Sequence, residues 1–133
     1  MSTNSTISLL NDDGTVTSVY CHWDGYPTHN GRLLVDHYNN PEIIRQLLAH
    51  GSMSILGKNI GEQHDFNDND PNVCTFYHRD RDEDLEVHTF GDIDSFIKAI
   101  QSDSYGQQYN YIFKNGTWYE TKYMKTVTEL LAT

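Results

Sequence analysis

YNYIFKNGTWYETKY, residues 109–123, is the stretch that decides the fold of this chain. Asn115 and Gly116 stand near its middle, and this pair is the strongest short signal for a two-residue β-turn, because both turn residues must adopt positive φ. The flanking runs, Tyr109 to Lys114 and Thr117 to Tyr123, are rich in the aromatic residues that strands favour. We therefore predict an antiparallel hairpin at the centre or at a recognition edge of a sheet.

Side chains of this hairpin alternate between two aromatic faces. One face carries Tyr109, Tyr111, Phe113 and Trp118, and the other carries Ile112, Tyr119 and Tyr123. Either both faces are buried in the core, or one of them stays partly exposed. Exposed aromatic rings beside acidic residues suit a protein partner.

A second hairpin is predicted at the amino-terminal end. Thr6 to Leu10 and Thr15 to Trp23 alternate in polarity around the turn-forming residues 11–14. Cys21 shares a strand face with Val19 and Trp23, so we expect its thiol in the core.

A central pair of strands is predicted from Val73 to Arg79 and from Leu85 to Phe90. The charged residues 80–84 join the two strands. The second strand alternates apolar and polar side chains, which is typical of a half-buried sheet.

Two amphipathic helices carry clear capping signals. Asn40 is a good N-cap, Pro41 follows at the first helical position, and Gly51 closes the helix. Asp92 caps the second helix, whose apolar stripe follows the i, i+3, i+4, i+7 pattern of a buried face. Shorter helices are predicted over residues 33–38 and after Thr126, which stands at capping-box spacing from Glu129.

Together these elements predict a single α+β domain over residues 1–133. An antiparallel β-sheet built from the hairpins is expected to pack, on one face, against two or three helices that include those capped by Asn40 and Asp92. A chain of 133 residues fits one domain of ordinary size, and no repeat or linker divides it.

Charge is the strongest compositional signal. The chain carries a formal net charge of −10 at pH 7, and twelve of its 19 acidic residues fall between Glu62 and Asp103, where only Arg79, Arg81 and Lys98 oppose them. A concentrated negative surface repels nucleic acid and anionic membranes and attracts basic protein surfaces.

No apolar run approaches the roughly 20 residues needed to cross a bilayer. Without a signal-peptide pattern at the start, we expect a cytosolic protein with reduced thiols.

The densest group of functional side chains lies in residues 20–31. It comprises Tyr20, His22, Trp23, Asp24, Tyr26 and His29, and crosses from a strand end into a loop, where binding sites tend to lie. These side chains are suited to a pocket for a nucleotide or another small polar ligand. The alternative is that the segment is scaffold, with Trp23 in the core and Asp24-Gly25 as a turn.

Three motifs carry a resemblance to a known group of proteins. They are VYCHWDGY at residues 19–26, CTFYHRDR at 74–81 and YNYIFKNGTWY at 109–119. The chain resembles a family of small, largely uncharacterised proteins encoded by bacteriophages and other mobile elements. That resemblance implies an accessory protein acting in the cytoplasm of a bacterial host cell, and it implies no catalytic residues.

Acidic residues alternate along the predicted central connection, at Asp80, Asp82, Asp84 and Glu86. Regularly spaced carboxylates imitate a phosphate backbone, so we expect these four residues, with Asp65, Asp68 and Asp70 of the preceding loop, to bind a partner. The alternative is a solvated hairpin tip whose charges are partly balanced by Arg79 and Arg81.

Metal binding is not expected. Cys74 and His78 share a predicted strand face but stand about 13 Å apart at the usual rise per residue, too far for one zinc ion. Asp65, Asn67, Asn69 and Asp70 imitate the start of a calcium loop, but Asp70 stands where the turn glycine belongs and Phe76 where the bidentate glutamate belongs.

Catalysis is not expected either, because the chain has no nucleophile elbow, P-loop, dinucleotide fingerprint or deaminase pattern. His22 with Asp24 is a candidate general acid/base pair, so catalysis stays an alternative to two binding functions. The first is inhibition of a host or defence protein with a basic surface, with nucleic-acid mimicry as one form of it. The second is binding of a small ligand, such as a nucleotide signal, at residues 20–30. Neither function requires a cofactor, direct contact with nucleic acid or a membrane.

Overall fold

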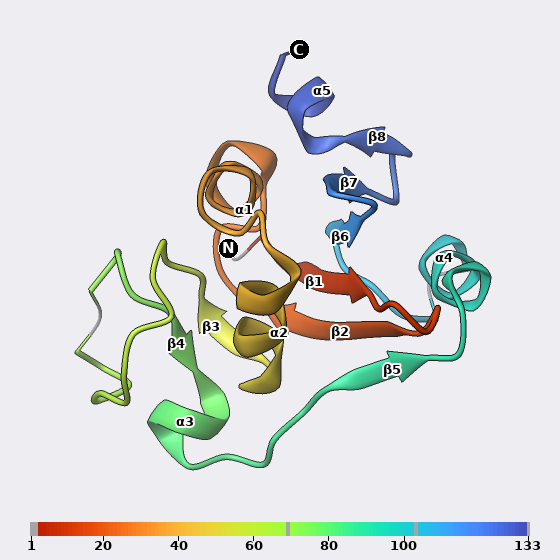
Figure 1. Ribbon diagram of the computed structural model, residues 1–133. Helices are drawn as coiled ribbons and strands as arrows, with labels where there is room; N and C mark the ends of the chain where they lie inside the picture. Colours follow the sequence, from red (N-terminus) through yellow and green to blue (C-terminus); the bar gives the residue numbers. More distant parts are fainter. Residues whose placement is uncertain (1–2, 69, 103, 133) are drawn as a thin grey trace.

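The computed structural model describes residues 3–68, 70–102 and 104–132, and shows one mixed sheet covered by short helices (Figure 1). The α+β class predicted from the sequence is confirmed. In chain order the elements are β1 (Ser5–Leu10), β2 (Val16–Cys21), the π-helix η1 (Pro27–Gly31), α1 (Arg32–His37), α2 (Pro41–Ala49), β3 (Met53–Ile55), β4 (Thr75–Phe76), α3 (Tyr77–Arg81), β5 (His88–Phe90), α4 (Ile93–Gln101), β6 (Tyr109–Lys114), β7 (Thr117–Glu120), β8 (Lys125–Thr126) and α5 (Val127–Leu131).

The sheet has the strand order β4-β3-β2-β1-β6-β7-β8, and β5 pairs with β2 beside this path. Most neighbouring strands are antiparallel, but β1 pairs with β6, and β2 with β3, in parallel. The sheet is therefore mixed, where the sequence predicted antiparallel pairing throughout. Parallel neighbours need a long crossover, and η1, α1 and α2 supply it between β2 and β3.

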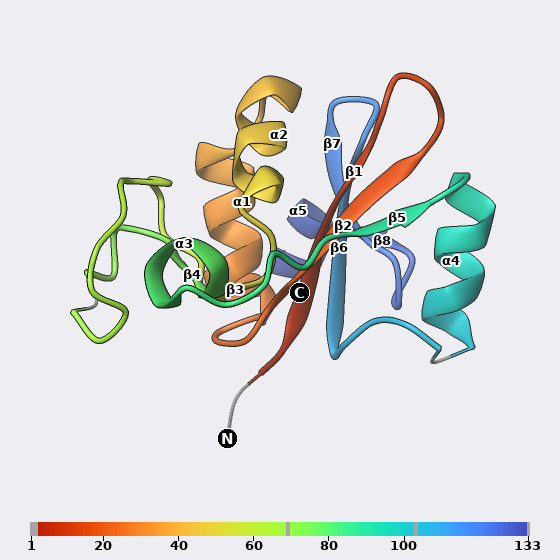
Figure 2. The same ribbon diagram turned by 90° about the horizontal axis from the view of Figure 1, so that it is seen from below.

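Helices cover both faces of the sheet (Figures 1 and 2). The larger core gathers residues of α1, α2 and α5 against Ile7, Val19 and Tyr111 of the sheet. On the opposite face, Phe96 and Ile100 of α4 pack against Val16 and Ile112. Helices α1, α2 and α5 thus lie on one face of the sheet. We expected α4 on the same face as α2, but it lies on the opposite face. A period-3.6 stripe shows that a helix is buried and does not show on which face.

Local signals in the sequence are confirmed. Asn115 and Gly116 have φ of 52° and 80° in the turn between β6 and β7. The Asn40 side chain accepts a hydrogen bond from the Glu42 N–H, and the Asp92 side chain accepts one from the Ser95 N–H. Thr126 and Glu129 form the expected capping box.

Buried positions agree only in part with the expected faces. Cys21 is fully buried, as predicted. Tyr109, Tyr111, Phe113 and Trp118 face the larger core, while Ile112 and Tyr119 belong to the smaller one. Tyr123 does not share their face, because β7 ends at Glu120 and Tyr123 lies in the following turn.

The predicted central pair of strands is wrong. Only Thr75–Phe76 and His88–Phe90 are strands, and they pair with β3 and β2 instead of with each other. Tyr77–Arg81 forms α3, because the Asp80 carboxylate turns back to accept a hydrogen bond from the Phe76 N–H at 2.8 Å. In the described residues, no helix is both long enough and apolar enough to span a bilayer.

Candidate functional site

The predicted site at residues 20–30 separates into two groups. In the first, the Tyr20 hydroxyl is hydrogen-bonded to Nδ1 of His22 at 2.6 Å, and the His22 ring meets Trp23 edge-on at 4.8 Å between centroids. Trp23 is 42% exposed, so it does not belong to the core.

The second group consists of Asp24, Tyr26 and His29. Oδ1 of Asp24 accepts a long hydrogen bond of 3.4 Å from the Tyr26 hydroxyl, and Oδ2 lies 3.9 Å from Nε2 of His29. The nearby Asp24 charge raises the pKa of the Tyr26 phenol. These three side chains therefore form one polar cluster at the surface.

Buried hydrogen bonds hold the backbone below this cluster. The buried Asn30 amide donates to the Trp23 carbonyl at 3.1 Å, and the buried Tyr111 hydroxyl donates to the Gly25 carbonyl at 2.6 Å. Asp24 has φ of 58°, a conformation that non-glycine residues seldom adopt. The next turn, Pro27–Gly31, is a π-helix, and π-helical turns are found frequently at functional sites. The segment is thus scaffold in its backbone and a candidate site in its exposed side chains.

Tyr26 also lines an open groove of about 470 Å³ on the protein surface. Pro27 and Thr28 line it beside Tyr26, while Tyr109 of β6, Tyr123 of the turn after β7 and Leu130 of α5 complete it. We call these six residues the tyrosine groove. Tyr26 is 38% exposed and Tyr123 is 54% exposed.

A buried carboxylate positions one side of the tyrosine groove. Glu120 has no exposed surface, and its Oε1 accepts from the Tyr123 N–H at 2.7 Å while Oε2 accepts from the Asn110 N–H at 2.6 Å. Burial raises the pKa of Glu120 despite these bonds. Glu120 thereby fixes the backbone of Tyr123 and of Asn110, which follows Tyr109. The rings of Tyr109 and Tyr123 lie 6.0 Å apart. Met124, which follows, has φ of 57°. Irregular backbone and a buried acid are costly features that concentrate at functional sites.

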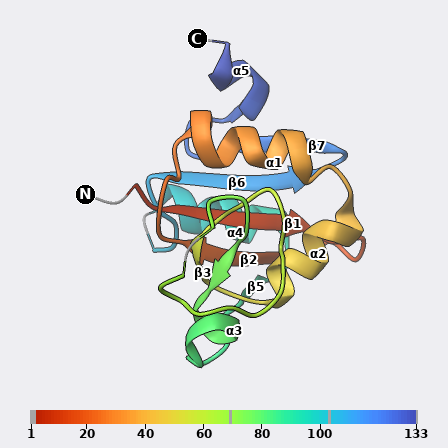
Figure 3. The same cartoon turned by 90° about the vertical axis from the view of Figure 1, so that its left-hand side faces the viewer.

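A second candidate surface, which we call the acidic end, lies on the loop between β3 and β4 and on the segment from α3 to β5. Figures 1 and 3 show that this loop and α3 are neighbours. The Phe66 ring stacks on Tyr77 at 5.6 Å, and the Arg81 guanidinium lies 4.3 Å from the Phe66 centroid. Its exposed carboxylates are those of Glu62, Asp65, Asp68, Asp70, Asp82, Glu83, Asp84 and Glu86.

Asp80 is the exception, and its predicted exposure is wrong. Its carboxylate is fully buried and receives two hydrogen bonds from Arg79, Nε to Oδ1 at 2.9 Å and Nη2 to Oδ2 at 3.1 Å. Burial alone would raise the pKa of Asp80, but the bonds from Arg79 and from the N–H groups of Phe76 and His64 outweigh it and lower the pKa. Asp80 is therefore a structural residue. Of the four predicted carboxylates, only Asp82, Asp84 and Glu86 are exposed.

His64 completes this buried ion pair. Its Nε2 lies 3.1 Å from the Cys74 carbonyl oxygen and 3.6 Å from Oδ2 of Asp80, and its Nδ1 lies 2.8 Å from the Asp65 carbonyl oxygen. Burial acts to lower the pKa of His64, but these oxygen neighbours prevail and raise it. The buried pair thus ties the acidic loop to α3.

The remaining predicted acids are exposed and differ in their local bonds. Asp65 accepts from the Asn67 N–H at 3.0 Å and Asp70 from the Asn72 N–H at 2.9 Å. Asp82 ends α3 with φ of 56°. Glu86 lies 3.4 Å from Nε2 of His88. Charges at these positions remain at the surface, where a partner could meet them.

Nothing in the described part of the chain forms a metal site of three or more His, Cys, Asp or Glu side chains. The strand geometry used to argue against zinc does not hold, because His78 lies on α3. Burial raises the pKa of Cys21 to about 12 and also raises that of Cys74, so both thiols are protonated and poor nucleophiles at neutral pH.

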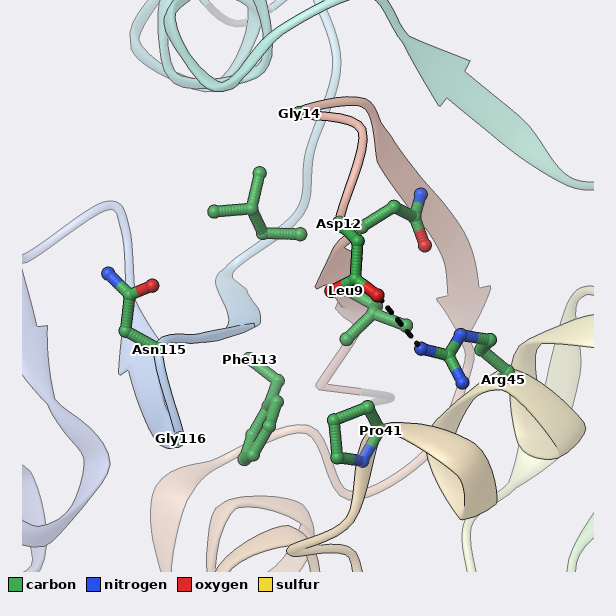
Figure 4. Close-up of a pocket in the computed structure, with 10 residues that line it drawn as sticks. Leu9, Asp12, Gly14, Pro41, Arg45, Phe113, Asn115 and Gly116 are labelled. Carbon is green, nitrogen blue, oxygen red and sulfur yellow. Dashed lines mark ion pairs between the residues drawn. The ribbon is translucent and has the colours of Figure 1, made fainter.

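A second cavity, of about 400 Å³, lies where the turns of the two hairpins meet the start of α2 (Figure 4). Arg45 is the one basic residue in its lining, and its guanidinium already faces the Asp12 carboxylate at 3.9 Å. Asp12 is fully exposed, so this pair holds no fixed geometry for a ligand.

Comparison with known proteins adds no assignment: no family model, curated protein or solved structure matches the chain. The resemblance to phage-encoded proteins stays a prediction.

Sequence reasoning missed Tyr109, Tyr123 and Leu130 as neighbours of Tyr26. For the two tyrosines, the only signal was the excess of aromatic residues in residues 109–123.

Proposed function

We propose that this protein is a non-enzymatic accessory protein that binds a basic surface of a partner protein through its acidic end and inhibits that partner. The observation that supports this most is the joining of two acidic segments: Phe66, Tyr77 and Arg81 stack where the loop meets α3. Four exposed carboxylates of the loop, those of Glu62, Asp65, Asp68 and Asp70, therefore lie beside α3, and the exposed acids of residues 82–86 follow α3 along the chain toward β5.

Three basic residues oppose part of this charge: Arg79 is held against the buried Asp80, Arg81 pairs with Glu83, and Lys58 is exposed in the loop between β3 and β4. The eight exposed carboxylates outnumber them. Such a surface speeds encounter with a basic partner and discriminates against acidic ones. The resemblance to phage-encoded proteins favours a host or defence protein in the bacterial cytoplasm as the partner, and a nucleic-acid-binding groove is the basic surface that carboxylates can imitate.

Affinity capture from a bacterial lysate, followed by titration with the captured protein, tests the proposal. We expect a triple variant, Asp82→Asn with Asp84→Asn and Glu86→Gln, to weaken binding and to reduce its salt dependence. A control removes the same charge elsewhere through Asp12→Asn, Asp36→Asn and Asp94→Asn, which are exposed positions outside the acidic end. An equal loss of affinity in the triple variant and in its control, or binding that salt does not weaken, would contradict the proposal.

Small-ligand binding is the second candidate function, and the convergence of Asp24, Tyr26 and His29 beside the tyrosine groove favours it. Tyrosine rings offer stacking faces for a base. Native mass measurement of the purified protein checks this: a retained small molecule, lost in Tyr26→Ala, supports it, and a mass equal to that of the chain alone counts against it.

A further inference from the structure

The tyrosine groove has the chemistry of a site for a cation. Three tyrosines line it, and two of them, Tyr26 and Tyr123, expose more than a third of their surface. The face of an aromatic ring carries negative potential and attracts a cation that lies within about 6 Å of it. Tyr109 and Tyr123 bring two such rings together at 6.0 Å.

A carboxylate contacts the hydroxyl of Tyr26, one of the residues that line this groove. The Asp24 side chain is 45% exposed and reaches the groove through its contact with the Tyr26 hydroxyl. Among the described residues, its ion-pair neighbour is His29 at 3.9 Å, and no lysine or arginine lies within 4 Å of its oxygens. Lys122 precedes Tyr123 in the chain, but its charge acts on the buried Glu120. A positively charged ligand would therefore find a counter-ion, and the net charge of −10 favours its approach.

We propose that the tyrosine groove binds an arginine side chain of a peptide or protein ligand, with the guanidinium stacked on the tyrosine rings and hydrogen-bonded to Asp24. Arginine fits better than lysine because its guanidinium is planar, stacks on aromatic faces and donates two parallel bonds to one carboxylate. The site goes beyond the proposed function, because none of its residues belongs to the acidic end.

Titration with a short blocked peptide, Gly-Arg-Gly, followed by NMR of the full-length protein, tests this. One side chain is expected to bind weakly, with Kd on the order of 1 mM. Signals of Tyr26, Tyr109 and Tyr123 should shift, and the lysine peptide should bind several-fold more weakly. The peptide in which uncharged, planar citrulline replaces arginine should leave these signals unchanged.

Two variants separate charge from ring stacking. Asp24→Asn keeps a residue that tolerates positive φ and removes the charge, so it should weaken binding several-fold without unfolding the protein. Tyr123→Leu keeps an apolar side chain and should also weaken binding. Asp36→Asn is the matched charge control, and it should bind as the wild type does.

Three results would overturn the assignment. They are unchanged tyrosine signals up to about 20 mM peptide, well above the expected Kd, equal binding of the citrulline peptide, and shifts confined to the acidic end. The triple acidic-end variant should bind the arginine peptide normally, so failure here and failure of the proposed function can be told apart.

Discussion

Replacing Arg79 by alanine should destabilise the protein strongly, because it breaks the buried ion pair with Asp80. All five N–H groups of Arg79 are used: besides its two bonds to Asp80, the guanidinium donates to the carbonyls of Ile60, Gly61 and Cys74 at 2.9–3.0 Å. Its side chain is only 10% exposed, and that of Asp80 is fully buried.

The expected cost follows from what the substitution leaves behind. Arg79→Ala leaves the buried Asp80 charge with only His64 beside it, 3.6 Å from Oδ2, and breaking a buried ion pair costs about 3–5 kcal/mol. For 133 residues the entropy of unfolding is about 0.28 kcal/mol/K, so Tm should fall by about 10–18 °C. Because the pKa of Asp80 is lowered in the folded state, this contribution is present above pH 3.8 and is lost as the pH falls through the lower, folded pKa.

Urea unfolding at pH 7, followed by circular dichroism, measures the effect as a lower midpoint at an unchanged slope. Arg81→Ala is the control, because Arg81 is half-exposed and its pair with Glu83 and stacking on Phe66 are worth about 1 kcal/mol in total. If Arg79→Ala lost no more stability than Arg81→Ala, the buried ion pair would not be the contact that holds the loop against α3.

Three further outcomes are expected. Burial raises the pKa of Glu120 above 4.5, so its contribution favours the folded state at low pH and declines as the pH rises through the folded pKa. Unfolding of Glu120→Gln, measured at several pH values, should show no such decline. This variant also loses a hydrogen bond worth about 1–3 kcal/mol. Gly57→Ala should lower the free energy of unfolding by about 1–3 kcal/mol, because its Cβ would lie 2.6 Å from the Val73 backbone nitrogen. In the control Gly91→Ala the new Cβ meets nothing within 4 Å, so its stability should stay near that of the wild type. Similar urea midpoints for the two variants would argue against this packing. Cys21 and Cys74 should resist a thiol reagent in the folded protein and react in urea, and fast labelling of the native protein would refute their burial.

The sequence by itself determined the features that depend on residues a few positions apart. The Asn115-Gly116 turn, the Asn40 and Asp92 caps and the Thr126 capping box all formed as predicted, because each depends on local backbone geometry and on bonds to the nearest N–H groups. The apolar stripes of α2 and α4 likewise predicted two buried helix faces.

Only the tertiary structure decided which strands pair, which face α4 covers and which distant side chains meet. β5 pairs with β2, a strand far from it in the sequence. Asp80 is buried because Arg79, Ile60, Cys74 and His64 converge from separate segments, which no local pattern encodes. Tyr26 was predicted as a site residue, but its neighbours Tyr109 and Tyr123 come from the other end of the chain. Their meeting depends on the parallel pairing of β1 with β6 and on the bonds of Glu120, and such long-range contacts form only when the whole sheet is assembled.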